Sequence, residues 1–308
     1  MLSNVISIKA VDPTGIYEKI LASPQEKRDD IYRYDLMKQF DRKWECFQIP
    51  LKAAAPGGYD IIMASDMLGY LTPSMMDESI RPSIEAMKSD LLWKTSEESV
   101  KKSLMRFTQA GIDLPVKEYL YTILLANPES PYIKNSDGYC GDGGIPGFIF
   151  GTIIPKPETI RRMPAALAHE VNHNVRFQFI EWRNDITLAE MMVSEGLAEN
   201  FATSLYTEEM LGPWVAKTDM ETLNDYIKPI IKEGLGAQGM AELSAYLYGD
   251  EFAMLSNYNP VGLPYCAGYA CGYYLIKYFL KKTGMSIEEA TILPAEDIMS
   301  QTEDFWND

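Results

Sequence analysis

The sequence has very little histidine, two residues among 308, so any histidine chemistry must come from one or both of them. The N-terminus lacks a basic segment followed by an apolar one, which argues against a secretory signal peptide. No run approaches the ~18 uninterrupted apolar residues that a membrane span needs. The four cysteines show no CxxC or zinc-ribbon spacing. We therefore expect free, buried thiols in a reducing cytoplasm rather than a disulfide framework.

Basic residues are also scarce, with 28 Lys and Arg against 44 Asp and Glu, which gives a net charge of −16. A field of that sign repels nucleic acid and anionic membrane, so neither is expected as a partner. Hydrophobic residues make up 46% and charged residues 23%, as in ordinary globular proteins. The length allows one large domain or two modest ones, and the sequence does not indicate an oligomeric state.

The hydrophobic pattern changes character near residue 118. Before it, apolar residues recur at three- and four-residue steps, which predicts mainly helices. After it come two strand-like runs, residues 119–126 and 147–154, separated by a Gly-rich loop. Helical periodicity then returns, with a first helix beginning near Pro164 and running to about residue 182, and later helices over 188–205 and 268–282.

This order predicts an α+β protein, mainly helical, with a small and largely antiparallel sheet next to the first of these late helices. We divide it into a helical N-terminal region, residues 1–118, and a second domain, residues 119–308. No repeat, low-complexity tract or Gly/Ser linker is visible.

Both histidines lie in one pentapeptide, His169-Glu170-Val171-Asn172-His173, within a segment of good helix formers. Residues i and i+4 lie on one helix face, so both imidazoles can share one cation. Glu170 is about 100° round the helix, close enough to reach a metal-bound water without being a ligand. The alternative is two ordinary histidines on an amphipathic helix. Zinc suits imidazole and carboxylate ligands in an open tetrahedral site.

A catalytic zinc site usually has three protein ligands, and no third histidine exists. Glu195 lies 22 residues after His173, on a segment that is otherwise apolar or small. Glu199 follows one turn later on the same face. Buried carboxylates need a cationic or hydrogen-bonding partner. Zinc would satisfy Glu195 and the ring N–H of a ligating histidine would satisfy Glu199, unless both belong to a solvated acidic face.

The combination of His169–His173 with the segment Ser194-Glu195-Gly196-Leu197-Ala198-Glu199 resembles the gluzincin, or thermolysin-like, zinc peptidases. It is most similar to a bacterial family of predicted zinc-dependent proteases whose function is unknown. The resemblance covers about residues 119–282. It implies zinc on His169, His173 and Glu195, Glu170 as general base and Glu199 as support for a ligand. Unlike thermolysin, this chain has Glu rather than Asp at position 199 and no further histidine for the oxyanion.

Tyrosines offer the missing oxyanion donor. Tyr265, Tyr269 and Tyr273 are spaced by four and share one face of a predicted helix, where Gly268 and Gly272 would allow close packing against a neighbour. Related aminopeptidases place a catalytic tyrosine 60–70 residues after the glutamate ligand. Here Tyr265 and Tyr269 lie 70 and 74 residues after Glu195. We favour Tyr269 as the catalytic residue because it matches the GYxxGY pattern of the resembling family, and Tyr265 as a substrate contact. The alternative is an aromatic core with hydroxyl groups at its rim.

The strand over residues 147–152 precedes the HExxH helix, as the substrate-lining edge strand does in the resembling peptidases. An extended peptide could pair with the backbone of Phe148, Ile149 and Phe150. The alternative is a plain structural strand. A calcium site at Asp137 and Asp142 lacks EF-hand spacing and is not expected.

These observations predict a cytoplasmic zinc metallopeptidase with one zinc ion per chain and a peptide or protein as substrate. Zinc would polarise the scissile carbonyl, and Glu170 would take the proton of the attacking water. Two alternatives remain open: a non-catalytic zinc-stabilised binding or regulatory module, and a zinc hydrolase of non-peptide amides or esters. The sequence does not separate endopeptidase from aminopeptidase action.

Overall fold

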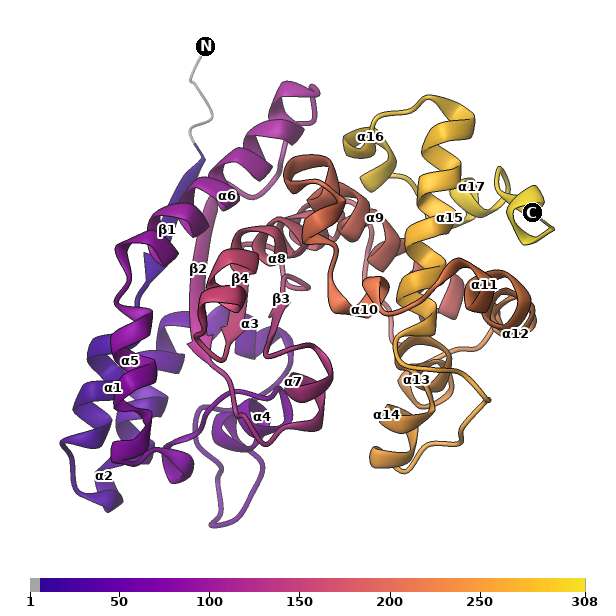
Figure 1. The fold of residues 1–308 in the computed structure, drawn as a ribbon. Helices are drawn as coiled ribbons and strands as arrows, with labels where there is room; N and C mark the ends of the chain where they lie inside the picture. The colour runs from indigo at the N-terminus through magenta and orange to yellow at the C-terminus, as the bar shows by residue number, and fades with distance from the viewer. Residues whose placement is uncertain (1–5, 308) are drawn as a thin grey trace. The chain divides into compact units, whose positions relative to one another are not determined.

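The computed structural model describes residues 6–307, and within them the chain is mainly helical with one small sheet (Figure 1). It forms two compact units: residues 1–102 with 116–170, and residues 103–115 with 171–308. Residues 119–170 thus share a unit with the N-terminal helices, whereas the sequence suggested one cut near residue 118. None of the described helices is both long and apolar enough to cross a membrane.

The first unit contains the sheet and the helices around it. Its strands and helices are β1 (Ser7–Val11), α1 (Thr14–Leu21), α2 (Gln25–Ile31), α3 (Asp41–Cys46), α4 (Ile61–Met67), α5 (Arg81–Met87), β2 (Glu118–Leu125), α7 (Pro131–Asn135), β3 (Tyr139–Asp142) and β4 (Phe148–Ile153). Two long helices, α6 (Asp90–Gln109) and α8 (Pro157–Arg176), begin in this unit and continue into the second.

The second unit is helical. It contains α9 (Leu188–Tyr206), α10 (Pro213–Ala216), α11 (Met220–Thr222), α12 (Lys228–Gly234), α13 (Met240–Tyr248), α14 (Asp250–Leu255), α15 (Ala267–Thr283), α16 (Ile287–Thr291) and α17 (Ala295–Met299). Shorter 3-10 and π-helical turns occur at Tyr32–Leu36, Met37–Phe40, Pro73–Met75, Glu78–Ile80, Glu208–Met210, Leu223–Ile227 and Glu303–Trp306.

The sheet has the strand order β1-β2-β4-β3 and is mixed. β1 pairs parallel to β2, β2 pairs parallel to β4, and only β3 runs antiparallel to β4. The prediction of a largely antiparallel sheet is therefore wrong. The segment between β2 and β4, which contains α7 and β3, is long enough for a crossover connection, and such connections join parallel strands.

The two faces of β4 pack against different elements. Phe150 lies in an aromatic cluster with Phe40, Trp44 and Tyr70, at centroid distances of 4.6, 5.8 and 6.2 Å respectively. On the opposite face, a Cβ added at Gly151 would lie 2.7 Å from Met163 Sδ of α8. The glycine therefore lets α8 lie directly against the sheet, as expected for a helix next to it.

The sequence predicted that this helix begins near Pro164. In the structure, α8 begins at Pro157. Pro164 lies inside the helix. Its missing N–H removes one intrahelical hydrogen bond without ending the helix. The helix ends at Arg176 rather than near residue 182, and residues 177–187 form the connection to α9.

Helix α9 is set in the middle of the second unit, and its residues from Leu188 to Ala202 are almost all buried. It starts with a capping box in which Thr187 and Glu190 satisfy each other's backbone N–H. It packs against α15, seen in yellow next to it in Figure 1. A Cβ on Gly272 would lie 2.2 Å from the Met192 carbonyl oxygen, which confirms the predicted close approach of the glycine-containing helix.

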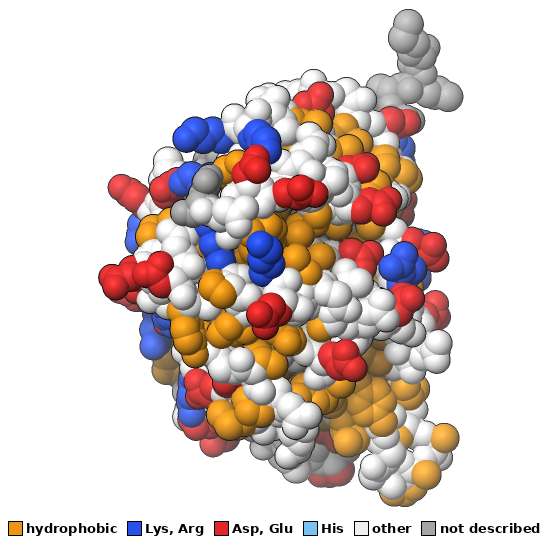
Figure 2. Space-filling view, turned by 90° about the vertical axis from the view of Figure 1, so that its right-hand side faces the viewer, with side chains coloured by type: hydrophobic (Ala, Val, Ile, Leu, Met, Phe, Trp, Pro, Cys, Tyr) orange, Lys and Arg blue, Asp and Glu red, His pale blue; other side chains and the backbone are white. Residues whose placement is uncertain are grey.

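All four cysteines are free, and three of them are buried. Cys46 is exposed, so the expectation of buried thiols is wrong for that residue, which stands at the end of the short helix α3. Figure 2 shows one face of the molecule, where acidic, basic and hydrophobic side chains are interspersed.

Candidate metal centre

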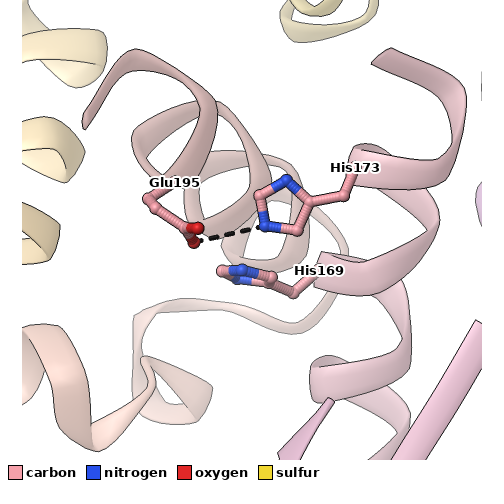
Figure 3. Close-up of side chains that lie close together, drawn as sticks. All are labelled: His169, His173 and Glu195. Atoms are coloured by element: carbon pink, nitrogen blue, oxygen red, sulfur yellow. Dashed lines mark hydrogen bonds and ion pairs between the residues drawn. The ribbon is translucent and has the colours of Figure 1, made fainter. Parts of the chain in front are cut away.

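His169, His173 and Glu195 form the group that could hold a metal ion. One ligand atom from each lies within 4.8 Å of the others, and all three side chains are buried. The histidines project from α8 toward Glu195 on α9, as Figure 3 shows. Three buried donors that converge in this way are costly without a cation, so the donor set fits a metal ion.

The imidazole of His173 is held at both nitrogens. Its Nε2 lies 3.2 Å from Oε2 of Glu195, and its Nδ1 lies 3.3 Å from Oγ of Ser194. The ring of Phe177 stacks on it at a centroid distance of 6.1 Å and an interplanar angle of 21°. Nε2 therefore faces the metal position, and Ser194 lies where it can fix the tautomer.

Glu170 is buried in the first unit against the strand β3. A Cβ at Gly141 would lie 2.4 Å from its Cγ, and a Cβ at Gly143 would lie 2.0 Å from its carbonyl oxygen. Only glycine allows this contact between the strand and the helix. Burial raises the pKa of the Cys140 thiol, and the nearby charge of Glu170 raises it further. Glu170 is not one of the three clustered donors.

Glu199 is buried one turn beyond Glu195, as predicted for two residues on one helix face. Its Oε1 accepts a hydrogen bond of 2.6 Å from the N–H of Gly212, and its Oε2 accepts one of 2.8 Å from Nε1 of Trp214. These bonds tie the N-terminal end of α10 to α9. Each carboxylate oxygen thus accepts one hydrogen bond, and a role for Glu199 in supporting a histidine ligand stays a prediction.

Tyr269 lies half-buried on α15, and its ring centroid is 5.7 Å from that of Tyr248. Burial raises the pKa of Tyr248, the charge of Glu195 raises it further, and a hydrogen bond with Tyr269 lowers it. Tyr248 was not found from the sequence, since nothing in α13 marks it. Tyr265 precedes α15, and the Lys217 ammonium lies 5.2 Å above its ring.

The predicted substrate contacts were placed on an edge strand, but β4 is an inner strand of the sheet. β4 lies between β2 and β3, and its residues from Phe150 to Ile153 pair on both sides, so β4 is not an edge strand. Phe148, Ile149 and Phe150 are buried in the sheet. The edge-strand argument was wrong because β3, hidden in the Gly-rich loop, occupies that edge of the sheet.

The fold and the site together define a class: a mainly helical α+β protein with a buried His–His–Glu group able to bind a metal ion. The chain belongs to the family described as "Predicted Zn-dependent protease (DUF2268)", whose model matches residues 92–300. It is 38% identical over 287 residues to "Uncharacterized protein YjfC" of Bacillus subtilis strain 168. The aligned region covers 92% of this chain and 94% of the relative. No solved structure gives a significant match.

Proposed function

We propose that the protein is a zinc metallopeptidase of the gluzincin type that hydrolyses peptide bonds. The observation that carries this proposal is the buried convergence of His169, His173 and Glu195. Two imidazoles and one carboxylate are a ligand set found in catalytic zinc sites, which keep a fourth position open. The family description, predicted zinc-dependent protease, supports the same metal and reaction.

Zinc, when bound, would supply the Lewis acid that polarises the scissile carbonyl and acidifies the attacking water. Glu170 would act as general base, because it follows His169 directly yet stands outside the donor group. We assign it the proton of the attacking water and its transfer to the leaving amine. Gly141 lies against this side chain and Gly143 against the backbone carbonyl of Glu170, so both restrict where the carboxylate can point.

Two further roles belong to the proposal. We place an extended peptide along β3, the strand that lies against Glu170, instead of along β4. We assign stabilisation of the tetrahedral oxyanion to the hydroxyl of Tyr269, which lies in the second unit beside Tyr248, whose pKa responds to Glu195.

The test is the Glu170→Gln variant, assayed for bound zinc and for cleavage of a quenched-fluorescent peptide library. An amide cannot accept the proton, so hydrolysis should fall by ~10²–10⁴-fold while zinc content stays unchanged. Glu158→Gln, at an exposed position on the same helix, is the matched control and should cleave as the wild type does.

Two outcomes would contradict the peptidase. A zinc-loaded wild type that cleaves no peptide would favour the binding-module alternative, and cleavage of amide or ester substrates alone would favour a non-peptide hydrolase. Equal rates for Glu170→Gln and wild type would remove Glu170 as the base.

A further inference from the structure

A cavity of about 700 Å³ lies in the second unit, behind the imidazole of His173. The end of α8, the connection to α9, the first half of α9 and the start of α17 form its walls. A volume of this size accommodates a small organic molecule. Its apolar walls include Ile186, Leu235 and Met299.

The charged group at the buried end of this cavity is Arg176, which is 2% exposed. Its Nη1 donates hydrogen bonds of 2.8 Å to the carbonyl oxygens of Thr291 and Leu293. Among the described residues, none places a carboxylate within ion-pair distance of this guanidinium. Burial lowers the pKa of Arg176 to about 10, although the charge of Glu190 acts in the opposite direction. A buried guanidinium of this kind favours an anion beside it.

The acidic residues that line the cavity are not buried beside Arg176. Glu181 and Glu296 are exposed and therefore belong to the mouth of the cavity. Glu190 is engaged by the N–H and hydroxyl of Thr187 and by Arg183. Arg183 is exposed in the lining as well, so two carboxylates and one guanidinium stand at the mouth. A mouth of this charge above one buried cation admits a single anionic group more readily than several. The ligand chemistry that fits is one carboxylate on an apolar body.

The cavity also touches the candidate metal centre. Ser194, whose Oγ lies 3.3 Å from Nδ1 of His173, is part of its lining. Phe177, which stacks on the same imidazole, is another lining residue, and Trp182 meets Phe177 edge-on at 5.7 Å. An occupant would therefore contact two of the side chains that hold His173.

We propose that this cavity binds a small organic monocarboxylate, with the carboxylate paired to Arg176 and the apolar body against Ile186, Leu235 and Met299. The carboxylate could belong to a free aliphatic acid or to the C-terminal residue of a peptide, which present the same group to the guanidinium. The proposal does not depend on the peptidase activity, because binding itself is measured.

The experiment titrates the full-length protein with octanoate by calorimetry and follows Trp182 fluorescence in parallel. Octanoate should bind with one site per chain. Octan-1-ol lacks the charge, so its affinity should be lower by about tenfold or more. Acetyl-Ala-Leu with a free C-terminus, compared with its amide, distinguishes a peptide from a free acid as the source of the carboxylate.

Two variants locate the site. Ala189→Phe fills the cavity from α9 and should abolish octanoate binding, whereas Ala241→Phe, at an exposed position on α13, should not change it. Arg176→Met should weaken octanoate about tenfold or more while leaving octan-1-ol unchanged. If Arg176→Met does not fold, Ala189→Phe still decides. No saturable octanoate binding, equal binding of the alcohol, or full binding by Ala189→Phe would overturn the proposal.

Discussion

The hydroxyl of Ser194 and Nδ1 of His173 lie 3.3 Å apart, on the side of the imidazole away from Glu195. With a metal ion bound at Nε2, the ring proton must sit on Nδ1, and the serine oxygen lies where it can accept that N–H. Ser194 is the residue directly before Glu195 on α9. One turn of helix thus supplies both a metal-binding carboxylate and the support of a second ligand.

Ser194→Ala should therefore weaken zinc binding by about tenfold, since the loss of a ligand's hydrogen-bond partner typically costs ~10–100-fold in metal affinity. Competition against a chelator of known zinc affinity measures this. Ser204→Ala on the same helix is the control, because that hydroxyl bonds to the carbonyl of Phe201 and to Arg106 and contacts none of the three clustered donors. An unchanged affinity for Ser194→Ala would show that the imidazole is oriented by other contacts.

Loss of a ligand should have a larger effect. The wild type should hold about one zinc per chain, and His169→Ala or His173→Ala should empty the site. Glu195→Gln should weaken zinc binding sharply, because an amide oxygen carries no charge. Elemental analysis of the purified variants measures zinc content, with the exposed Glu181→Gln as control. Full zinc content in both histidine variants would refute the assignment of the metal centre.

A buried ion pair links the N-terminal helices to the strand beside Glu170. Lys43 is fully buried, and its Nζ lies 2.7 Å from Oδ2 of Asp142, with the rings of Phe47 and Phe150 at 5.2 and 4.9 Å. Asp142 in turn accepts a hydrogen bond from the N–H of Gly144. This pair therefore fixes the Gly-rich loop that contacts Glu170.

Lys43→Met should lower the free energy of unfolding by about 3 kcal/mol, near the lower end for a broken buried pair, because Asp142 is partly exposed. Urea unfolding measures the change, and the exposed Lys38→Met serves as control. The double variant Lys43→Met/Asp142→Asn should recover part of the loss. Equal stability of Lys43→Met and wild type would mean that the aromatic rings alone hold this region.

The sequence predicted best what local pattern determines. The predicted helix over residues 188–205 matches α9, which has a capping box at Thr187, and that over 268–282 matches α15, which ends at Gly284 in a left-handed conformation. The three clustered donors were also found, because both histidines occur in one motif.

The sequence did not predict what depends on distant partners. β3 lies in a Gly-rich segment with no strand composition, and it forms a strand only by pairing with β4. The parallel pairing of β1 with β2 joins residues more than a hundred positions apart. Arg176 follows an ordinary helical pattern, and only the packing of α16 and the segment after it shows that it is buried. Ser194 stands next to Glu195 in the sequence, but its contact with Nδ1 of His173 depends on the orientation of the imidazole, which the sequence does not give.

The proposed oxyanion donor can be tested with a pair of tyrosine variants on α15. Tyr269→Phe should retain zinc and the fold yet lower kcat by ~10²–10³, with little change in KM, if its hydroxyl stabilises the tetrahedral oxyanion. Tyr274→Phe, on the same helix, is the matched control. Steady-state kinetics on the best peptide of the library measures both.

Tyr248→Phe completes the test, because Tyr248 hydrogen-bonds with Tyr269 and responds to the charge of Glu195. If Tyr269 is the donor, Tyr248 only positions it, and Tyr248→Phe should cost less than Tyr269→Phe. The double variant should then be no slower than Tyr269→Phe alone, since the two residues act through one hydroxyl. A larger loss for Tyr248→Phe would move the oxyanion role to Tyr248. Wild-type rates for both variants would leave the oxyanion to a donor outside this tyrosine pair.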